Sequence, residues 1–93
     1  MERRWGVREF DWDEDNEEHI ARHGVAPQEA EEVFFGRIHL KRARSGRYLV
    51  YGRSGTGRHL ALIVEKRPGG VVRVITARDM GDEERWFYRR RRK

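Results

Sequence analysis

The chain has 93 residues, enough for one domain with a single thin core and little room for a deep enclosed pocket. Charged residues make up 40% of it, but three Trp, three Tyr and four Phe supply core material that disordered chains lack. With no cysteine, disulfides, thiol catalysis and cysteine zinc ligands are excluded. No apolar run could span a bilayer and the charged start does not resemble a signal peptide, so we expect a cytoplasmic protein.

Charge is divided unevenly between the two parts of the chain. Residues 1–36 hold 4 Lys/Arg and 11 Asp/Glu, a net charge of −7, whereas residues 37–93 hold 17 and 5, a net charge of +12. A basic half of this kind favours contact with a polyanion such as nucleic acid. The acidic half either binds a basic partner or folds against the basic half.

The first part of the chain is expected to form a short strand and two helices. The predicted elements are a strand over 5–12, a helix over 13–23 and a second helix over 27–36. Asp13 is a favourable N-cap, Gly24 a C-cap and Pro27 a first-turn residue, so the two helices should make a tight hairpin.

The second part is predicted to be mostly β. Short turns separate candidate strands over 38–42, 48–52, 60–65 and 71–77, and a last helix begins near Asp82 with Trp86 and Phe87 as its apolar anchors. Short turns predict an antiparallel sheet. The last two strands are apolar on both faces, so the helical hairpin should cover one face and the terminal helix or aromatic residues the other. We therefore predict one α+β domain over 1–93, in the order β-αα-ββββ-α, with a frayed basic tail over 89–93.

Two histidines of the first predicted helix are candidate site residues. His19 and His23 have the i, i+4 spacing that can bind a metal, but no third ligand is evident, and the alternative is a pair that satisfies surface carbonyls. His23 ends the helix, where the dipole supports an imidazolium that could hold a phosphate. A structural capping role explains His23 equally well.

Arginines near the strand ends form a second candidate group. Arg67 follows the third strand, Arg78 follows the fourth and Arg85 lies in the first turns of the last helix. These guanidinium groups could therefore converge on a phosphate at one end of the sheet. Glu65 could orient an arginine or act as a base. The alternative is that these charged side chains simply face solvent. Further candidates for nucleic-acid contact are Arg53, Arg73, Arg89, Arg90, Arg91, Arg92 and Lys93. Residues 89–93 could instead be a tail that only increases solubility.

Three passages together resemble the BrnT family of toxins. They are Phe10-Asp11-Trp12-Asp13, then His23-Gly24-Val25, then Val74-Ile75-Thr76-Ala77-Arg78-Asp79-Met80 followed by Glu84-Arg85 and Tyr88. The chain departs from the family pattern in having Arg22, Thr76 and Gly81 where Lys, Ser and Thr are usual.

The resemblance implies a RelE- and ParE-like fold, ribonuclease activity that inhibits translation, and a DNA-binding antitoxin partner. It carries over His23, Arg67, Arg78 and Arg85 as the site, with Tyr88 nearby. In the hypothesis we derive from it, the RNA 2′-hydroxyl attacks the adjacent phosphate, which requires no metal or cofactor. The alternatives are a module that binds RNA or the ribosome without cutting, and a decayed toxin that retains only its partner. The chain could form a homodimer, or a heterotetramer with the antitoxin.

Overall fold

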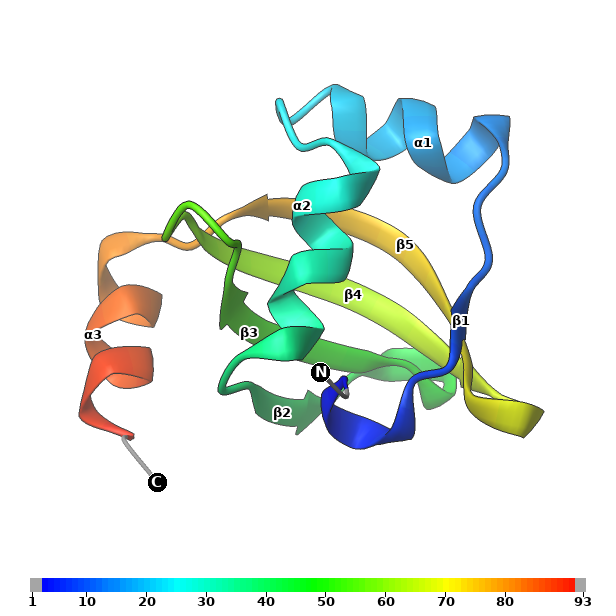
Figure 1. The fold of residues 1–93 in the computed structure, drawn as a ribbon. Helices are drawn as coiled ribbons and strands as arrows, with labels where there is room; N and C mark the ends of the chain where they lie inside the picture. Colours follow the sequence, from blue (N-terminus) through cyan, green and yellow to red (C-terminus); the bar gives the residue numbers. More distant parts are fainter. Residues whose placement is uncertain (1–2, 92–93) are drawn as a thin grey trace.

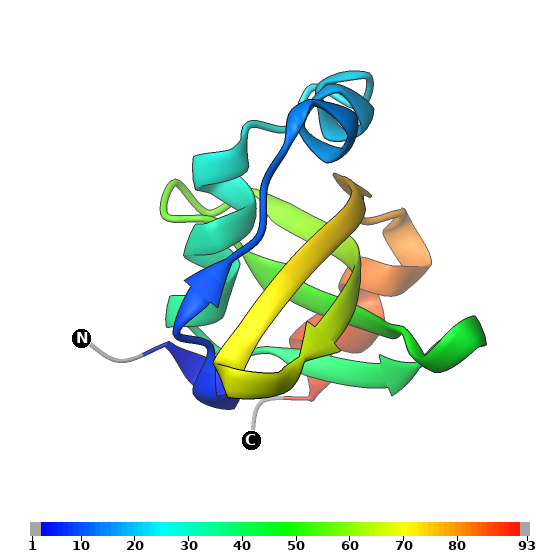
Figure 2. The ribbon, with the colours of Figure 1, turned by 90° about the vertical axis from the view of Figure 1, so that its right-hand side faces the viewer.

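A computed structural model describes residues 3–91 and shows an α+β fold. Its elements are β1 (Glu9–Phe10), α1 (Glu14–Ala21), α2 (Pro27–Glu32), β2 (His39–Arg42), β3 (Tyr48–Arg53), β4 (His59–Arg67), β5 (Val71–Asp79) and α3 (Asp82–Arg90). The five strands form one sheet in the order β1-β5-β4-β3-β2 (Figure 1). Helices α2 and α3 lie on opposite sides of this sheet (Figure 2), as the two-faced apolar strands predicted.

The first strand differs from the prediction. Only Glu9–Phe10 is extended and paired, in place of the expected strand over 5–12, and Arg4–Gly6 forms a 3-10 turn. β1 runs parallel to β5, so the sheet is mixed, whereas the other three strand pairs are antiparallel as expected. The chain passes from β1 through both helices to β2 at the far edge of the sheet, which leaves β1 to pair with the free edge of β5.

The helical hairpin follows its sequence signals. The Asp13 carboxylate accepts from the Asn16 amide at 3.2 Å, and the Asn16 side chain accepts from the Asp13 amide at 2.8 Å, a reciprocal cap. Asn16 is buried, and its Nδ2 donates to the carbonyls of Asp11 and Val74, each at 2.9 Å. This one side chain therefore joins α1 to β5. Gly24, at φ +70°, takes the left-handed turn that lets the chain reverse into α2.

The main core lies between the hairpin and the sheet. Ile20, Phe34, Leu60, Leu62 and Val74 are its largest or most central members, and each is fully buried. Alternate residues of β4 point to this face, which is the period-2 pattern of a strand. The core fixes the sheet on which the site residues are carried.

A smaller apolar cluster lies under α3 on the opposite face. Tyr51, Ala61 and Met80 bury Tyr88, which is 3% exposed. The prediction that Trp86 and Phe87 anchor this helix is wrong: they are 54% and 51% exposed. Tyr88 lies on the buried side of this short helix, and because successive residues of a helix point in different directions, Trp86 and Phe87 lie on other faces.

Within residues 3–91, no helix has the length and apolar character needed to cross a membrane.

Candidate functional site

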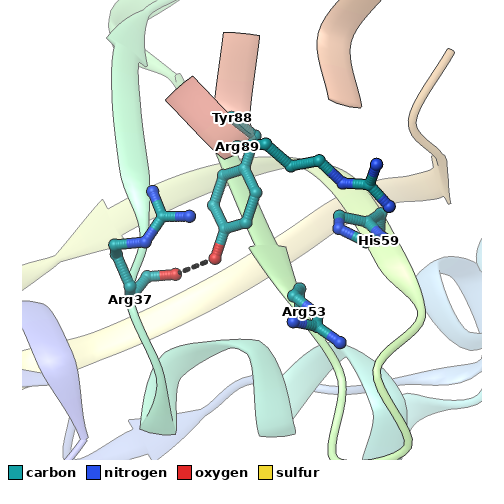
Figure 3. Close-up of a pocket in the computed structure, with 5 residues that line it drawn as sticks. All are labelled: Arg37, Arg53, His59, Tyr88 and Arg89. Carbon is teal, nitrogen blue, oxygen red and sulfur yellow. Dashed lines mark hydrogen bonds between the residues drawn. The ribbon is translucent and has the colours of Figure 1, made fainter. Parts of the chain in front are cut away.

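A shallow hollow opens at the end of the sheet where β3 ends and β4 begins. Its volume is about 550 Å³, and α3 forms one wall (Figure 3). The lining residues are Arg37, Arg53, His59, Tyr88 and Arg89. We call this hollow the cationic pocket.

The β3–β4 hairpin places two of these side chains. Arg53 and His59 are directly paired across the antiparallel strands. Gly57, in the turn between them, has φ +92°, and a Cβ added there would come within 2.8 Å of Arg53 Nη2. The carbonyl of Gly57 accepts from Arg53 Nε at 3.3 Å. A glycine in the turn thus leaves room for the arginine to fold back over the hairpin.

Tyr88 forms the fixed part of the pocket. Its hydroxyl donates to the Arg37 carbonyl at 2.6 Å, and the Arg37 guanidinium lies 3.9 Å from the centre of the Tyr88 ring. The Arg37 side chain also donates to the Arg91 carbonyl at the end of α3. The ring of His59 meets the Tyr88 ring edge-on, with 5.8 Å between centroids. The buried tyrosine therefore holds an arginine and a histidine in fixed positions around one hollow.

The charges around His59 have one sign. Partial burial lowers its pKa from 6.5, and the positive charges of Arg53, Arg89, Arg85 and Arg37 lower it further. The imidazole is therefore neutral at neutral pH and can accept a proton. Three arginines line the pocket, and no carboxylate is found among its described lining residues. Such a pocket attracts a phosphate group and places a base beside it.

Arg78, a predicted site residue, lies next to α3 and is engaged there. Its Nη1 and Nη2 donate to the two Glu84 oxygens at 2.6 and 2.9 Å. Tyr51 donates to the same carboxylate at 2.9 Å. These contacts lower the pKa of Glu84 to about 2, and burial together with Glu84 raises the pKa of Tyr51 to about 12. The ion pair fastens α3, the helix that carries Tyr88 and Arg89, to β5.

The expectation that Arg67 and Arg78 converge is wrong. Arg67 pairs with Val71 at one end of β4, whereas Arg78 pairs with Ala61, six residues and about 20 Å along the strand. Because β4 and β5 are antiparallel, residues that follow successive strands lie at opposite ends of the sheet.

Glu65 and Arg67 belong to a separate charge network. Glu65 accepts from Arg47 and Arg67, each at 3.1 Å, and both arginines lower its pKa. Arg67 also pairs with Asp11 at 2.5 Å. Arg73 is held close by, 2.9 Å from Asp13. These groups tie the N-terminal segment to β4 and β5, away from the cationic pocket.

The other predicted residues are dispersed. His23 is exposed in the turn that follows α1, where its ring stacks on that of His19 with 6.4 Å between centroids, and neither histidine lines the pocket. Arg85 pairs with Asp82 at 3.0 Å but remains close enough to affect His59. Arg90 lies over the Trp86 ring. Of the basic tail, Arg89 lines the pocket and Arg91 follows α3, while Arg92 and Lys93 lie outside the described residues.

Sequence reasoning missed three residues of this region. His59 and Arg37 line the pocket, and Arg58 binds Asp79 at 2.7 Å and Glu29 at 3.1 Å, clamping the helical hairpin to the end of the sheet. Pairing the predicted strands across the glycine-rich turn would have placed His59 opposite Arg53. The sequence holds no comparable local signal for Arg37, because its contact with Tyr88 spans 51 positions.

A hollow lined by guanidinium groups around an imidazole has the chemistry that binding a phosphate group requires. Residues 12–84 match the family described as "Ribonuclease toxin, BrnT, of type II toxin-antitoxin system", and this chain belongs to that family. The family implies an RNA substrate and an antitoxin partner. Among curated proteins, no significant match is found. Arg37, Arg53 and His59 fall inside the matched range, whereas Tyr88 and Arg89 follow it.

Proposed function

We propose that this chain cleaves RNA in the cationic pocket without a metal ion and thereby inhibits translation in the cytoplasm. The observation that carries the proposal is the neutral His59 among Arg37, Arg53 and Arg89 in a pocket whose described lining holds no carboxylate. RNA contains its own nucleophile, the 2′-hydroxyl, so the protein needs only to orient the backbone, accept a proton and stabilise charge.

In the proposed reaction the 2′-oxygen forms a bond to the adjacent phosphorus as the bond to the 5′-oxygen breaks. His59 accepts the proton of the 2′-hydroxyl, and the departing 5′-oxygen receives a proton from water. The products are a 2′,3′-cyclic phosphate and a 5′-hydroxyl end. Arg37, Arg53 and Arg89 surround the phosphate, where the negative charge of the phosphorane develops.

The residues predicted from the sequence take different parts in this proposal. Arg53, Tyr88 and Arg89 belong to the pocket itself, and Arg78 and Arg85 support α3 at its edge. His23, Glu65 and Arg67 are assigned to the fold, because their contacts join structural elements outside the pocket.

The direct test is incubation of the purified chain with a defined RNA in excess EDTA, followed by analysis of the fragment ends. We expect cleavage to persist with the chelator and to leave 2′,3′-cyclic phosphate and 5′-hydroxyl ends. Cleavage that stops with EDTA contradicts the metal-independent mechanism. Salt-sensitive RNA binding without fragments, by folded protein, favours the binding module instead.

A further inference from the structure

A second cleft lies beside α3, between this helix and the outer faces of β2 and β3. Its volume is about 260 Å³, somewhat below the range of sites for drug-sized molecules. The residues that matter here are His39, Lys41, Glu83, Phe87, Tyr88 and Arg91. Tyr88 lines both this cleft and the cationic pocket, so the two hollows are neighbours across one aromatic ring.

The cleft offers flat aromatic surfaces. The His39 ring stacks on the Tyr51 ring, with 6.2 Å between centroids and 12° between planes. Burial, assisted by the charges of Arg91, Lys41 and Arg37, lowers the pKa of His39 and favours the neutral ring. On the helix side, Phe87 is 51% exposed. Unpaired bases of RNA bind to platforms of this kind by stacking.

The polar groups of the cleft have a defined pattern. The Glu83 carboxylate makes no hydrogen bond or ion pair within residues 3–91, whereas that of its neighbour Glu84 accepts from Arg78 and Tyr51. A free carboxylate presents two acceptors and no donor. The Watson–Crick edge of guanine presents two parallel donors, N1–H and the 2-amino group, whereas the other bases place an acceptor beside each donor. Guanine is therefore the base that matches Glu83 with two hydrogen bonds.

We propose that this cleft is a guanine subsite that selects the nucleotide beside the cleaved phosphate, with Glu83 as the specificity-determining residue. The place of this subsite beside a cleaved phosphate rests on the proposed ribonuclease function, but guanine binding can be measured without cleavage. Lys41 and Arg91, on the cleft wall, supply positive charge for the backbone of the same RNA strand.

The test uses fully 2′-O-methylated trinucleotides, in which the nucleophile is blocked, with the full chain. UGU, UIU, UAU and UCU differ only in the central base, and inosine lacks the 2-amino group. We expect UGU to bind roughly tenfold more tightly than the other three, the factor typical of one bidentate contact. Glu83→Gln should remove this preference and leave the affinity for UAU unchanged. Glu17→Gln, an exposed carboxylate on α1, is the matched control and should retain the preference.

Equal affinity for all four trinucleotides overturns the proposal, as does a guanine preference that survives Glu83→Gln in a folded variant. Parallel cleavage of unmodified RNA separates the two claims. Cleavage without guanine preference rejects the subsite and keeps the ribonuclease. Guanine preference without cleavage keeps the subsite as a binding site and rejects the ribonuclease.

Discussion

Arg53 and His59 face each other across the β3–β4 pair, and the turn that joins them contains the left-handed Gly57. A seven-residue segment, 53–59, thus places a cation and a proton acceptor side by side. Tyr88 and Arg89 reach the same point from α3, far along the chain. The positions of Arg53 and His59 are therefore set by a local hairpin, whereas those of Tyr88 and Arg89 depend on how α3 packs against the sheet.

The first prediction concerns phosphate stabilisation. Arg53→Ala should lower the rate constant of RNA cleavage by about 10² to 10³, the usual loss when one donor to a developing negative charge is removed. The dependence of RNA affinity on salt should also weaken by about one phosphate contact. Single-turnover cleavage and salt-titrated binding measure the two effects. Arg44→Ala, in the exposed β2–β3 turn, is the control and should change neither.

The second prediction concerns the buried tyrosine. Tyr88→Phe removes the hydroxyl that donates to the Arg37 carbonyl at 2.6 Å, and should lower the free energy of unfolding by about 1–2 kcal/mol. Cleavage should fall as well, because α3 loses one of its contacts with Arg37. Denaturant unfolding and initial rates give both values. For comparison, Tyr48→Phe alters a hydroxyl with no hydrogen bond within the described residues, and equal effects of the two changes would contradict this role for Tyr88.

The third prediction concerns acid stability. The pKa of Glu84 is lowered from 4.5 to about 2, so its ion pair with Arg78 contributes fully above pH 4.5, and the contribution is lost as pH falls from 4.5 towards 2. Arg78 is 46% exposed, and solvent screening reduces the expected value to about 1–2 kcal/mol. Glu84→Gln should therefore destabilise the protein at pH 7, less at pH 3 and least near pH 2. Glu83→Gln is the adjacent control, and a pH-independent difference for Glu84→Gln would reject the ion-pair contribution.

The fourth prediction concerns the link between α1 and β5. Asn16→Ala leaves the Asp11 and Val74 carbonyls without their donor and removes half of the reciprocal cap, so we expect a loss of about 2–3 kcal/mol in unfolding free energy. Glu17→Ala, exposed in the same helix, should cost far less. A loss below 1 kcal/mol for Asn16→Ala, seen in urea unfolding, would show that the buried amide does not hold the helix.

The fifth prediction concerns the pH dependence of cleavage. The pKa of His59 lies below 6.5, so a base in this position is neutral at neutral pH and becomes protonated as pH falls. The value of kcat/KM should rise with pH, with a midpoint below 6.5, and be level from pH 7 to 8. A profile that still rises with pH above 7 would indicate a different base.

Much of the fold followed from local signals. Asp13, Gly24 and Pro27 bound the helical hairpin, and the glycine-rich turns separate the antiparallel strands, because each of these residues has a strong backbone or capping preference. The parallel pairing of β1 with β5 could not be predicted from local sequence, because it depends on how the helical hairpin packs on the sheet and on which edge of the sheet is left free. The anchoring of α3 by Tyr88 rather than Trp86 likewise depends on tertiary packing.

The sequence anticipated only part of the group of residues that line the pocket, and the misplacement of Arg67 has a simple geometric cause. Arg53, Tyr88 and Arg89 were separate candidates in the sequence and lie together around the pocket, whereas Arg67 was expected beside Arg78 on the assumption that strand ends meet. In an antiparallel sheet the end of one strand lies beside the beginning of the next. Applied strictly, that rule brings His59, at the start of β4, to Arg53, at the end of β3.

The most direct test of the account is the single-turnover rate of RNA cleavage by His59→Gln, compared with His19→Gln, an exposed histidine on α1. We predict that His59→Gln lowers the rate by about 10² to 10⁴ while RNA affinity and the fold are retained, and that His19→Gln cleaves like the unaltered protein. Cleavage by folded His59→Gln at the unaltered rate would contradict the assignment of the cationic pocket as the site of the reaction.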